Sequence, residues 1–273
     1  MRNISVLVKL ILALIAIVAI IAPFTFLKPV YTPVKPPEPK VVEVVKPKPV
    51  EQPLHSVQLP DFGSIPDVKE KKRQFFAFIR PSIEDENARL RGLRAKLLEI
   101  QAQIMLEEEL SDQDLLWLGD LAKQYRLAKN LTPFQQMDQL VARVDEIPTA
   151  LVLVQAANES AWGTSRFARI GLNFFGIWCY RKGCGMVPRA RNSGANHEVE
   201  AFKSVDAAVK RYLHNINTNN AYILFRSIRR QLREQDQALL PEILATGLVP
   251  YSERGADYVL ELTDMLRHNR AYF

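Results

Sequence analysis

The spacing of apolar residues constrains the fold of this chain more than any other feature of its sequence. From residue 66 onward, apolar side chains recur at every third or fourth position, as in the set Phe75, Phe78 and Ile79. This is the period of a helix that buries one face. Before residue 185 there is no convincing alternation of apolar and polar residues, the pattern that indicates a strand. The sequence therefore predicts a mainly α fold in which helices pack on helices.

Start and stop signals divide this pattern into segments. Pro81 is predicted to separate the first helix from the long one after it, because proline cannot donate the backbone hydrogen bond of a helix interior. Ser111, which is followed by acidic residues, is predicted as an N-cap. Residues 198–202 (EVEAF) are predicted to form one strand of a small hairpin at most. Further helices are predicted at residues 114–127, 133–144, 148–160, 206–216, 221–233, 238–247 and 257–268.

The N-terminus carries an apolar run with no charge from Leu10 to Leu27, close to the length that crosses a bilayer. Arg2 and Lys9 precede it, so we expect the N-terminus to stay in the cytoplasm and the rest of the chain to enter the periplasm. The alternative is a cleaved signal peptide, which needs small residues at −1 and −3 of the cleavage site. Cleavage after Ala22 would leave Ile20 at −3, so an uncleaved, single-pass anchor in the inner membrane is favoured.

Residues 28–65 are rich in proline, with lysine and glutamate between the prolines. Such a segment cannot bury a core and favours the extended polyproline II conformation. At about 3.1 Å per residue it would reach on the order of 100 Å. It is predicted to be a linker between the anchor, residues 1–27, and a helical part that begins at residue 66.

Charge and short motifs exclude several classes of function. The net charge of +6 arises from 36 lysines and arginines spread along the chain. A mild excess of this kind suits an acidic polymer or a lipid surface, but without a dense basic block it does not indicate nucleic-acid binding. No glycine-rich phosphate loop, zinc-protease motif or nucleophile elbow is present. We therefore expect no nucleotide or other cofactor.

The two cysteines, Cys179 and Cys184, enclose only the residues YRKG. Two cysteines and four scattered histidines do not make a zinc site, so no metal is predicted. Export would make a disulfide their natural state. Closing so short a loop would contribute about 2–3 kcal/mol. A pair of reduced, buried thiols is the alternative.

One carboxylate stands in apolar company. Glu159 lies in the stretch QAANESAWGTSRFA, residues 155–168, at the end of an apolar helical run. An apolar environment disfavours the charged form of a carboxyl group, so its pKa is expected to rise. A raised pKa lets a carboxyl group act as a general acid near neutral pH. By itself the pattern is weak, because acids at helix ends are more often solvated surface groups.

The residues around Glu159 extend this pattern. ESAWGTS at 159–165 and GLNFFGIW at 171–178 resemble the signature of the bacterial glucosaminidase domain, glycoside hydrolase family 73, in its exported Bax-type branch. Ala161 replaces a glycine of the family pattern and Phe174 a leucine. HNINTNNAY at 214–222 and the tyrosine segment LVPYSERGADYVLEL at 248–262 are similar to later segments of the family. The resemblance covers about residues 66–273 and implies a lysozyme-like helical fold.

The resemblance also implies roles for individual residues. Glu159 matches the general acid, Tyr251 matches a tyrosine that faces the acid across the cleft, and Tyr258 matches the tyrosine that begins the last helix and is assigned to substrate binding. Core packing is the alternative for Tyr258 and Phe175, and Trp162 is expected to pack behind Glu159. The segment implied to line the sugar groove consists of Asn173, Phe174, Phe175 and Gly176.

The sequence does not decide which group acts as the second catalytic group. Glycosidases usually need a partner carboxylate as base or nucleophile. In the interval where relatives carry it, this chain has Glu198 and Glu200, and either is a candidate. If neither serves, the N-acetyl oxygen of the substrate would attack the sugar carbon itself, with Tyr251 positioning it.

The hypothesis is a membrane-anchored peptidoglycan hydrolase that cleaves the β-1,4 bond after N-acetylglucosamine, with residues 66–135 as an N-terminal helical region packed on a glucosaminidase domain at 136–273. Its expected partners are the glycan strands and, through the anchor, the inner membrane; no protein partner is indicated. Two alternatives stay open. The domain is a peptidoglycan-binding module without activity, as the unassigned second carboxylate suggests, or a scaffold whose helices at 66–130 dock a partner.

Overall fold

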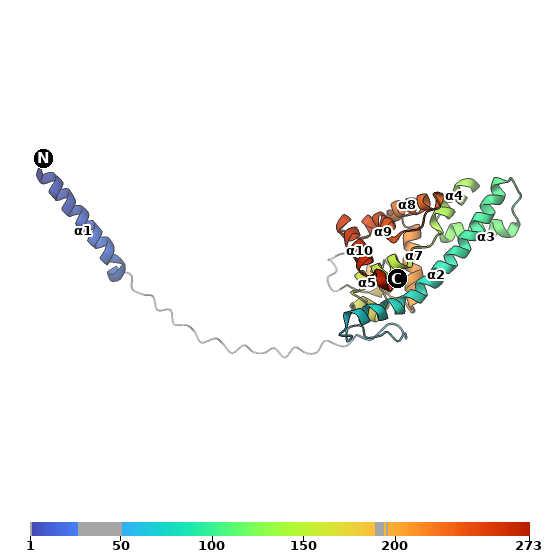
Figure 1. The fold of residues 1–273 in the computed structure, drawn as a ribbon, viewed down its shortest axis with the longest axis horizontal. Helices are drawn as coiled ribbons and strands as arrows, with labels where there is room; N and C mark the ends of the chain where they lie inside the picture. The colour runs from blue at the N-terminus through green and yellow to red at the C-terminus, as the bar shows by residue number, and fades with distance from the viewer. Residues whose placement is uncertain (1, 27–50, 189–193, 195) are drawn as a thin grey trace. The chain divides into compact units, whose positions relative to one another are not determined.

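The structure is a computed structural model that describes residues 2–26, 51–188, 194 and 196–273 (Figure 1). The chain divides into two compact units, Met1–Pro49 and Val50–Phe273. In the first unit, α1 spans Arg2–Phe26. Within the part of the chain that the structure describes, no helix has both the length and the apolar character needed to cross a bilayer. The anchor stays a prediction, and the linker from residue 27 to residue 50 lies outside the described residues.

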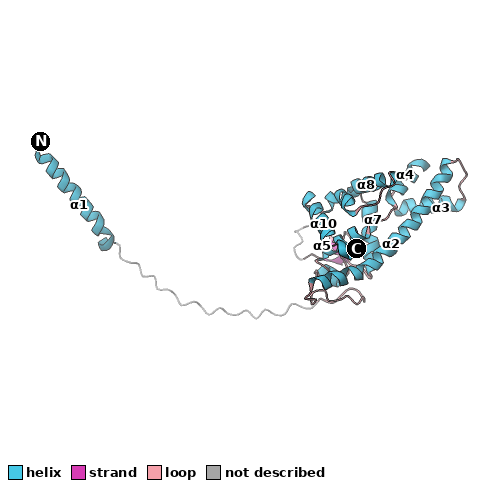
Figure 2. Cartoon of the chain, in the orientation of Figure 1, coloured by secondary structure: helices cyan, strands magenta, loops and turns pink. Residues whose placement is uncertain are grey.

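The second unit is mainly helical with a minor sheet (Figure 2), which confirms the predicted mainly α, lysozyme-like class. It holds both the region at 66–135 and the region at 136–273. Its helices are α2 (Val68–Met105), α3 (Asp112–Gln124), α4 (Pro133–Arg143), α5 (Thr149–Ser160), α6 (Arg166–Gly171), α7 (Val205–Thr218), α8 (Ile223–Glu234), α9 (Pro241–Ala245) and α10 (Ala256–His268), with 3-10 turns at Asn220–Tyr222, Thr246–Tyr251 and Arg270–Tyr272.

The longest helix of this unit, α2, runs through Pro81 without a break, so the predicted division at that proline is wrong. Proline inside a helix costs about 3 kcal/mol because it removes one hydrogen bond and crowds the preceding turn. Here Pro81 and Ala77, whose carbonyl loses its partner, are both exposed, so water can replace the lost bond. On the opposite face Ile79 and Ile83 are fully buried, and their packing holds the helix together.

Helix α5 is the centre of the unit. It packs against α2, α9 and α10, and eight of its twelve residues are buried. Leu151, Val152, Leu153 and Val154 are all 0% exposed although they are consecutive. Consecutive residues point in different directions around a helix, so α5 is enclosed on all sides rather than along one stripe.

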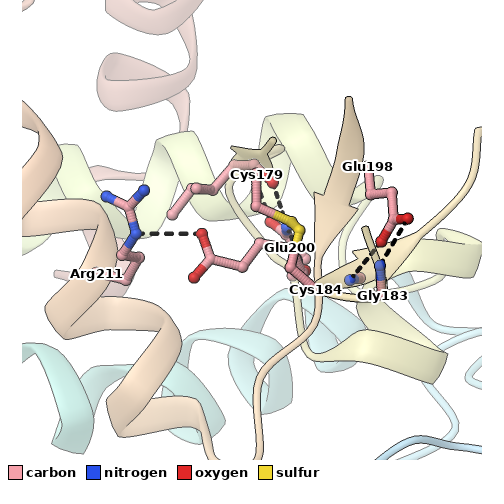
Figure 3. Close-up of a disulfide and its surroundings, with 9 residues drawn as sticks. Cys179, Gly183, Cys184, Glu198, Glu200 and Arg211 are labelled. Atoms are coloured by element: carbon pink, nitrogen blue, oxygen red, sulfur yellow. Dashed lines mark hydrogen bonds and ion pairs between the residues drawn. A yellow bond between two sulfur atoms is a disulfide. The ribbon is translucent and has the colours of Figure 1, made fainter. Parts of the chain in front are cut away.

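The sheet has three short antiparallel strands in the order β1-β3-β2, where a hairpin at most was predicted. They are β1 (Trp178–Cys179), β2 (Gly185–Met186) and β3 (Glu198–Glu200). In the register, Trp178 and Met186 both pair with Val199 of the central strand. A Cβ atom at Gly185 would lie 1.9 Å from the Val199 carbonyl oxygen, so this close approach requires glycine. The Cys179–Cys184 disulfide closes the loop between β1 and β2 (Figure 3).

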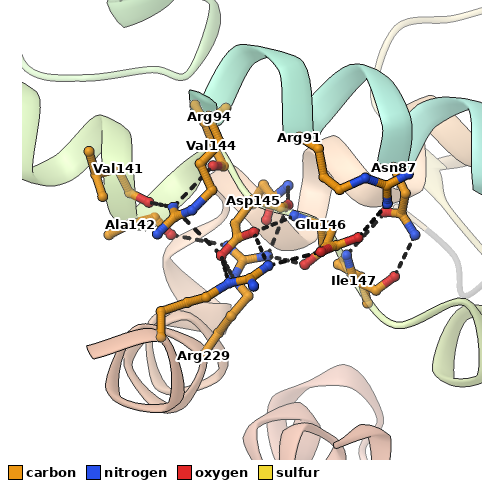
Figure 4. A network of polar contacts seen from close by, with 12 residues as sticks. Asn87, Arg91, Arg94, Val141, Ala142, Val144, Asp145, Glu146, Ile147 and Arg229 are labelled. Carbon is orange, nitrogen blue, oxygen red and sulfur yellow. Dashed lines mark hydrogen bonds and ion pairs between the residues drawn. The ribbon is translucent and has the colours of Figure 1, made fainter. Parts of the chain in front are cut away.

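A buried ionic network joins α2 and α8 to the loop before α5 (Figure 4). Its centre is Asp145, 2% exposed, which lies 2.9 Å from Arg233 Nη2, 3.6 Å from Arg94 Nη1 and 3.8 Å from Arg229 Nε. Burial by itself would raise the pKa of Asp145. The nearby arginine charges and the hydrogen bond from Arg233 outweigh burial and hold that pKa below its usual range.

The end of the predicted linker differs from the extended spacer expected over 28–65. The Leu54 backbone N–H donates to the Ile170 carbonyl at 2.8 Å. Phe62 is 1% exposed and packs edge-on against Phe75, with ring centroids 5.4 Å apart. Val57, Leu59 and Ile65 also pack against the core. Residues 51–65 therefore form part of the folded unit, because the burial of these apolar side chains helps to offset the entropic cost of ordering the segment.

Candidate active site

A cleft of about 890 Å³ opens at the C-terminal end of α5. Glu159 lies in its wall. The other walls come from the segment after α6 through β1, from β3, from α7 and from the 3-10 turn that contains Tyr251. The lining residues are Arg126, Glu159, Phe175, Gly176, Ile177, Trp178, Cys179, Tyr180, Arg181, Cys184, Glu200, Arg211, Asn215, Asn219, Ala221, Tyr222, Pro250 and Tyr251. Of these, only Arg126 comes from the region at 66–135.

Glu159 is presented by an abrupt helix end. Ala161 and Trp162, which follow α5, both adopt left-handed backbone angles, with φ of 50° and 58°. The chain therefore turns away one residue after the last turn of α5. Trp162 packs against the ring of Phe76, with centroids 5.2 Å apart, so it supports the helix end from behind, as predicted. Glu159 is left half-buried at the cleft.

Burial raises the pKa of Glu159, and a hydrogen bond with Tyr258 partly opposes that rise. The backbone of Gly176 also lies close to this carboxyl group, since a Cβ atom at Gly176 would be 3.7 Å from Glu159 Oε2. With φ of +64°, Gly176 has the left-handed conformation that glycine adopts at no cost. The raised pKa inferred from sequence therefore has an identifiable cause, which is desolvation by the surrounding protein.

Two tyrosines stand beside Glu159, but only one of them reaches the cleft. Tyr251 lines the cleft, and its hydroxyl donates to the Phe175 carbonyl at 2.7 Å. Tyr258 is stacked on Tyr251, with centroids 5.4 Å apart, and is only 1% exposed. Its hydroxyl accepts a hydrogen bond from Gln155 Nε2 at 3.1 Å. Tyr258, predicted to bind substrate, is thus behind the acid and not in the lining.

In the segment from Asn173 to Gly176, too, some of the predicted groove residues are buried and others line the cleft. Asn173 is 2% exposed, and its amide bonds to backbone groups of Phe175, Ile177 and Glu200. Phe174 is fully buried in the core. Phe175 stacks on Tyr212 with centroids 4.2 Å apart, and it contributes to the cleft lining together with Gly176. Asn173 and Phe174 therefore shape the segment, and Phe175 and Gly176 face the cleft.

The two candidate second carboxylates have different surroundings (Figure 3). Glu198 is 6% exposed and outside the cleft lining, and its two oxygens accept from the backbone N–H groups of Gly183 and Gly185, both at 2.9 Å. Glu200 lines the cleft and lies 3.1 Å from Arg211 Nε on α7. The structure thus brings Glu200 into the same cleft as Glu159, whereas Glu198 holds the loop between β1 and β2 through its hydrogen bonds.

The predicted disulfide between Cys179 and Cys184 is present, and both residues belong to the rim of the cleft. Their sulfurs lie near the carboxylate of Glu198, a grouping of metal-ligand types. Because the two sulfurs are bonded to each other, they cannot offer the thiolates that bind zinc. The arrangement acts as a brace, in which the disulfide and Glu198 hold the loop between β1 and β2.

Two exposed aromatic residues of the cleft were not singled out from the sequence. Trp178 is 50% exposed and stacks on His197 at 4.1 Å, and Tyr180 is 75% exposed. Large aromatic side chains left open to solvent are well suited to pack against the apolar faces of sugar rings. The available signal was the sequence WCY directly after the glycine of the NFFG segment. Its two-residue strand was too short to recognise.

Comparison with known proteins places this cleft in context. Residues 135–269 match the glucosaminidase family, described as mannosyl-glycoprotein endo-beta-N-acetylglucosaminidase. The chain is 34% identical over 216 residues to Protein bax of Escherichia coli (strain K12), an alignment that covers 79% of this chain and 76% of that protein. No solved structure matches the chain. Every residue singled out near the cleft, from Glu159 to Tyr258, lies within the range matched by the family.

The burial of Glu159 is expected to lower the stability of the folded protein at neutral pH. Its pKa is raised in the folded protein, so as the pH rises above the unfolded value of about 4.3 the folded state holds the extra proton and loses stability. Glu159→Gln replaces the ionisable carboxyl group with a neutral amide and so removes the buried negative charge. We expect a higher Tm at pH 7, by about 2–4 °C for each kcal/mol relieved, and little change at pH 4.

Thermal unfolding at both pH values measures this effect. Glu84→Gln is the control, because Glu84 is exposed on α2 and pairs only loosely with Arg80 at 3.6 Å. A Glu159→Gln protein that is less stable than the wild type at pH 7 would contradict the assignment.

Proposed function

The chain belongs to the glucosaminidase family, glycoside hydrolase family 73, and from this membership we propose that it hydrolyses peptidoglycan glycan strands at the β-1,4 bond after N-acetylglucosamine. It is a glycoside hydrolase of the endo-β-N-acetylglucosaminidase type. The observation that carries the proposal is the half-buried Glu159 in the wall of an open cleft. An open cleft edged with the exposed aromatic residues Trp178 and Tyr180 suits a polymer of sugar rings.

In the proposed reaction Glu159 is the general acid. Burial raises its pKa and so favours the protonated form that a general acid needs. As the bond between the anomeric carbon and the glycosidic oxygen breaks, that oxygen takes the bonding electron pair and the proton of Glu159. The carboxylate that remains keeps its hydrogen bond with Tyr258. The sugar carbon becomes electron-poor and needs a nucleophile or an activated water.

For this second role we propose Glu200. It shares the cleft with Glu159, whereas Glu198 uses both oxygens to bind loop amides. Arg211 fixes the direction of Glu200 through its Nε. Tyr251, whose hydroxyl is engaged by the Phe175 carbonyl, would hold the Gly176 segment against the acid. The alternative nucleophile is the N-acetyl oxygen of the substrate.

The first test is hydrolysis itself. We expect the full-length protein to release fragments with reducing N-acetylglucosamine ends from peptidoglycan, as measured by reducing-end labelling and mass spectrometry. Glu159→Gln should lower the rate by a factor of about 100 or more, because a general acid contributes that much, while Glu84→Gln should not. If the wild type binds the insoluble wall without releasing fragments, the protein is a binding module and the enzymatic proposal fails.

A matched pair of substitutions tests the second carboxylate. Glu200→Gln should lower kcat by a factor of about 100 or more and leave Tm nearly unchanged, since Glu200 lies at the cleft. Glu198→Gln should instead lower stability by about 1–3 kcal/mol, because one backbone N–H loses its acceptor, and leave kcat within about twofold. Full activity in Glu200→Gln would point to the substrate-assisted route.

We also propose that the N-terminal segment anchors the enzyme in the inner membrane with the cleft in the periplasm. The support is the uncharged run from Leu10 to Leu27, the preceding Arg2 and Lys9, and a disulfide that suits an oxidising compartment. Wild-type protein should stay in the membrane pellet after alkaline carbonate extraction. Val18→Lys, which costs about 2.5–3.5 kcal/mol at a membrane centre, should be extracted. Release of the wild type would contradict the anchor.

A further inference from the structure

We propose that Gln155 is a positioning residue of the active site, which fixes the direction of the Tyr258 hydroxyl so that it always donates to Glu159. The inference deepens the proposed function and relies on it for the role of Glu159. It concerns a side chain that does not reach the cleft and therefore cannot bind substrate.

Gln155 lies one helical turn before Glu159 on α5 and is 0% exposed. Both ends of its amide are bound. The Tyr212 hydroxyl donates to Gln155 Oε1, and Gln155 Nε2 donates to the Tyr258 hydroxyl at 3.1 Å. Tyr258 in turn forms a hydrogen bond with Glu159. The four side chains make one continuous chain from the core to the acid.

The donors and acceptors of these four side chains fix the direction of every hydrogen bond in the series. Tyr212 is 1% exposed, and a tyrosine hydroxyl has one proton to donate. If the amide flipped, its NH₂ group would face Tyr212, and the buried Tyr212 hydroxyl would lose Oε1 as its acceptor, so the flip is disfavoured. Nε2 therefore faces Tyr258. The Tyr258 oxygen already accepts this bond, so its single proton is left for Glu159.

A fixed donor at one end has two consequences for Glu159. One carboxyl oxygen accepts the hydrogen bond from Tyr258, so the acid carries its own proton on the other oxygen, from which it can pass to the substrate. When that proton leaves, the hydrogen bond to the carboxylate is charge-assisted and therefore stronger. This series of hydrogen bonds thus stabilises the Glu159 carboxylate that remains after proton transfer, without contacting the sugar.

The other charged and titratable groups that act on Glu159 are few. Glu261 on α10 raises its pKa and Arg254 lowers it, and these two residues pair with each other at 2.7 Å. Tyr222 and Tyr251 are neutral near pH 7, since burial raises the pKa of both. The hydrogen bond from Tyr258 is the largest influence that opposes burial.

Gln155→Met tests the proposal, because methionine has a similar length and cannot form hydrogen bonds. The pKa of Glu159 should rise, since the Tyr258 hydroxyl is free to turn away from the carboxylate. It is measured directly from the ¹³C carboxyl signal of the full-length protein, assigned by its absence in Glu159→Gln. The alkaline limb of the kcat/KM profile should move to higher pH, with kcat lower by about tenfold and KM within about twofold.

A double-mutant cycle tests whether Gln155 acts through Tyr258. Tyr258→Phe alone should shift the Glu159 titration in the same direction, and adding Gln155→Met should have no further effect on it. Tyr212→Phe is a milder variant that removes only the hydroxyl that orients the amide, and it should give a smaller shift of the same sign. It keeps the test decisive if Gln155→Met does not fold.

Asn87→Leu is the matched control, because Asn87 is a buried amide that bonds to the backbone of Ile147, just before the N-terminal end of α5 and away from Glu159 at its C-terminal end. It should lower Tm but leave the Glu159 titration unchanged. An unshifted titration in both Gln155→Met and Tyr212→Phe, or additive shifts in the cycle, would overturn the proposal. Since the titration needs no turnover, a protein that fails to hydrolyse peptidoglycan still answers this question separately.

Discussion

The enclosure of α5 is the constraint on which the rest of the second unit depends. A helix with consecutive buried residues from Leu151 to Ala157 needs neighbours on every side, and α2, α9 and α10 supply them. Burial of each of its leucine and valine side chains contributes about 1.5–3 kcal/mol, so the position of α5 is firmly determined. Its last turn is then the one place where the helix meets the cleft, and Glu159 occupies that place.

The two ends of α5 show how one scaffold gives two carboxylates opposite properties. Asp145, just before the helix, is surrounded by arginines that hold its pKa down. Glu159, in the last turn, is desolvated without a direct ion pair, and its pKa is raised. The first environment stabilises the charged form and ties α2 to α8. The second environment favours the protonated form of Glu159 next to an open cleft.

The features predicted correctly from sequence depend on local chemistry. The Ser111 N-cap, the Cys179–Cys184 pair and most helices follow from residue types within a few positions of each other. The errors arose where distant contacts decide. Pro81 remains inside α2 because Ile79 and Ile83, on the face opposite the exposed proline, are buried in the core. The buried Phe62 holds residues of the expected linker in the fold. Tyr258 was assigned to substrate binding by the resemblance, with core packing as the alternative, and its burial behind Tyr251 favours core packing.

The sequence by itself determined that the chain is helical, that Glu159 ends an apolar helix and that its neighbours resemble a glucosaminidase. These are properties of periodicity and motif, which depend on residues close together along the chain. Only the tertiary structure decided that Glu200 faces the cleft while Glu198 holds a loop, and that Gln155 donates a hydrogen bond to Tyr258 behind Glu159. The reason is that hydrogen bonds between distant segments, and the burial of side chains there, depend on how the helices pack. Residues that are neighbours in the sequence do not determine that packing.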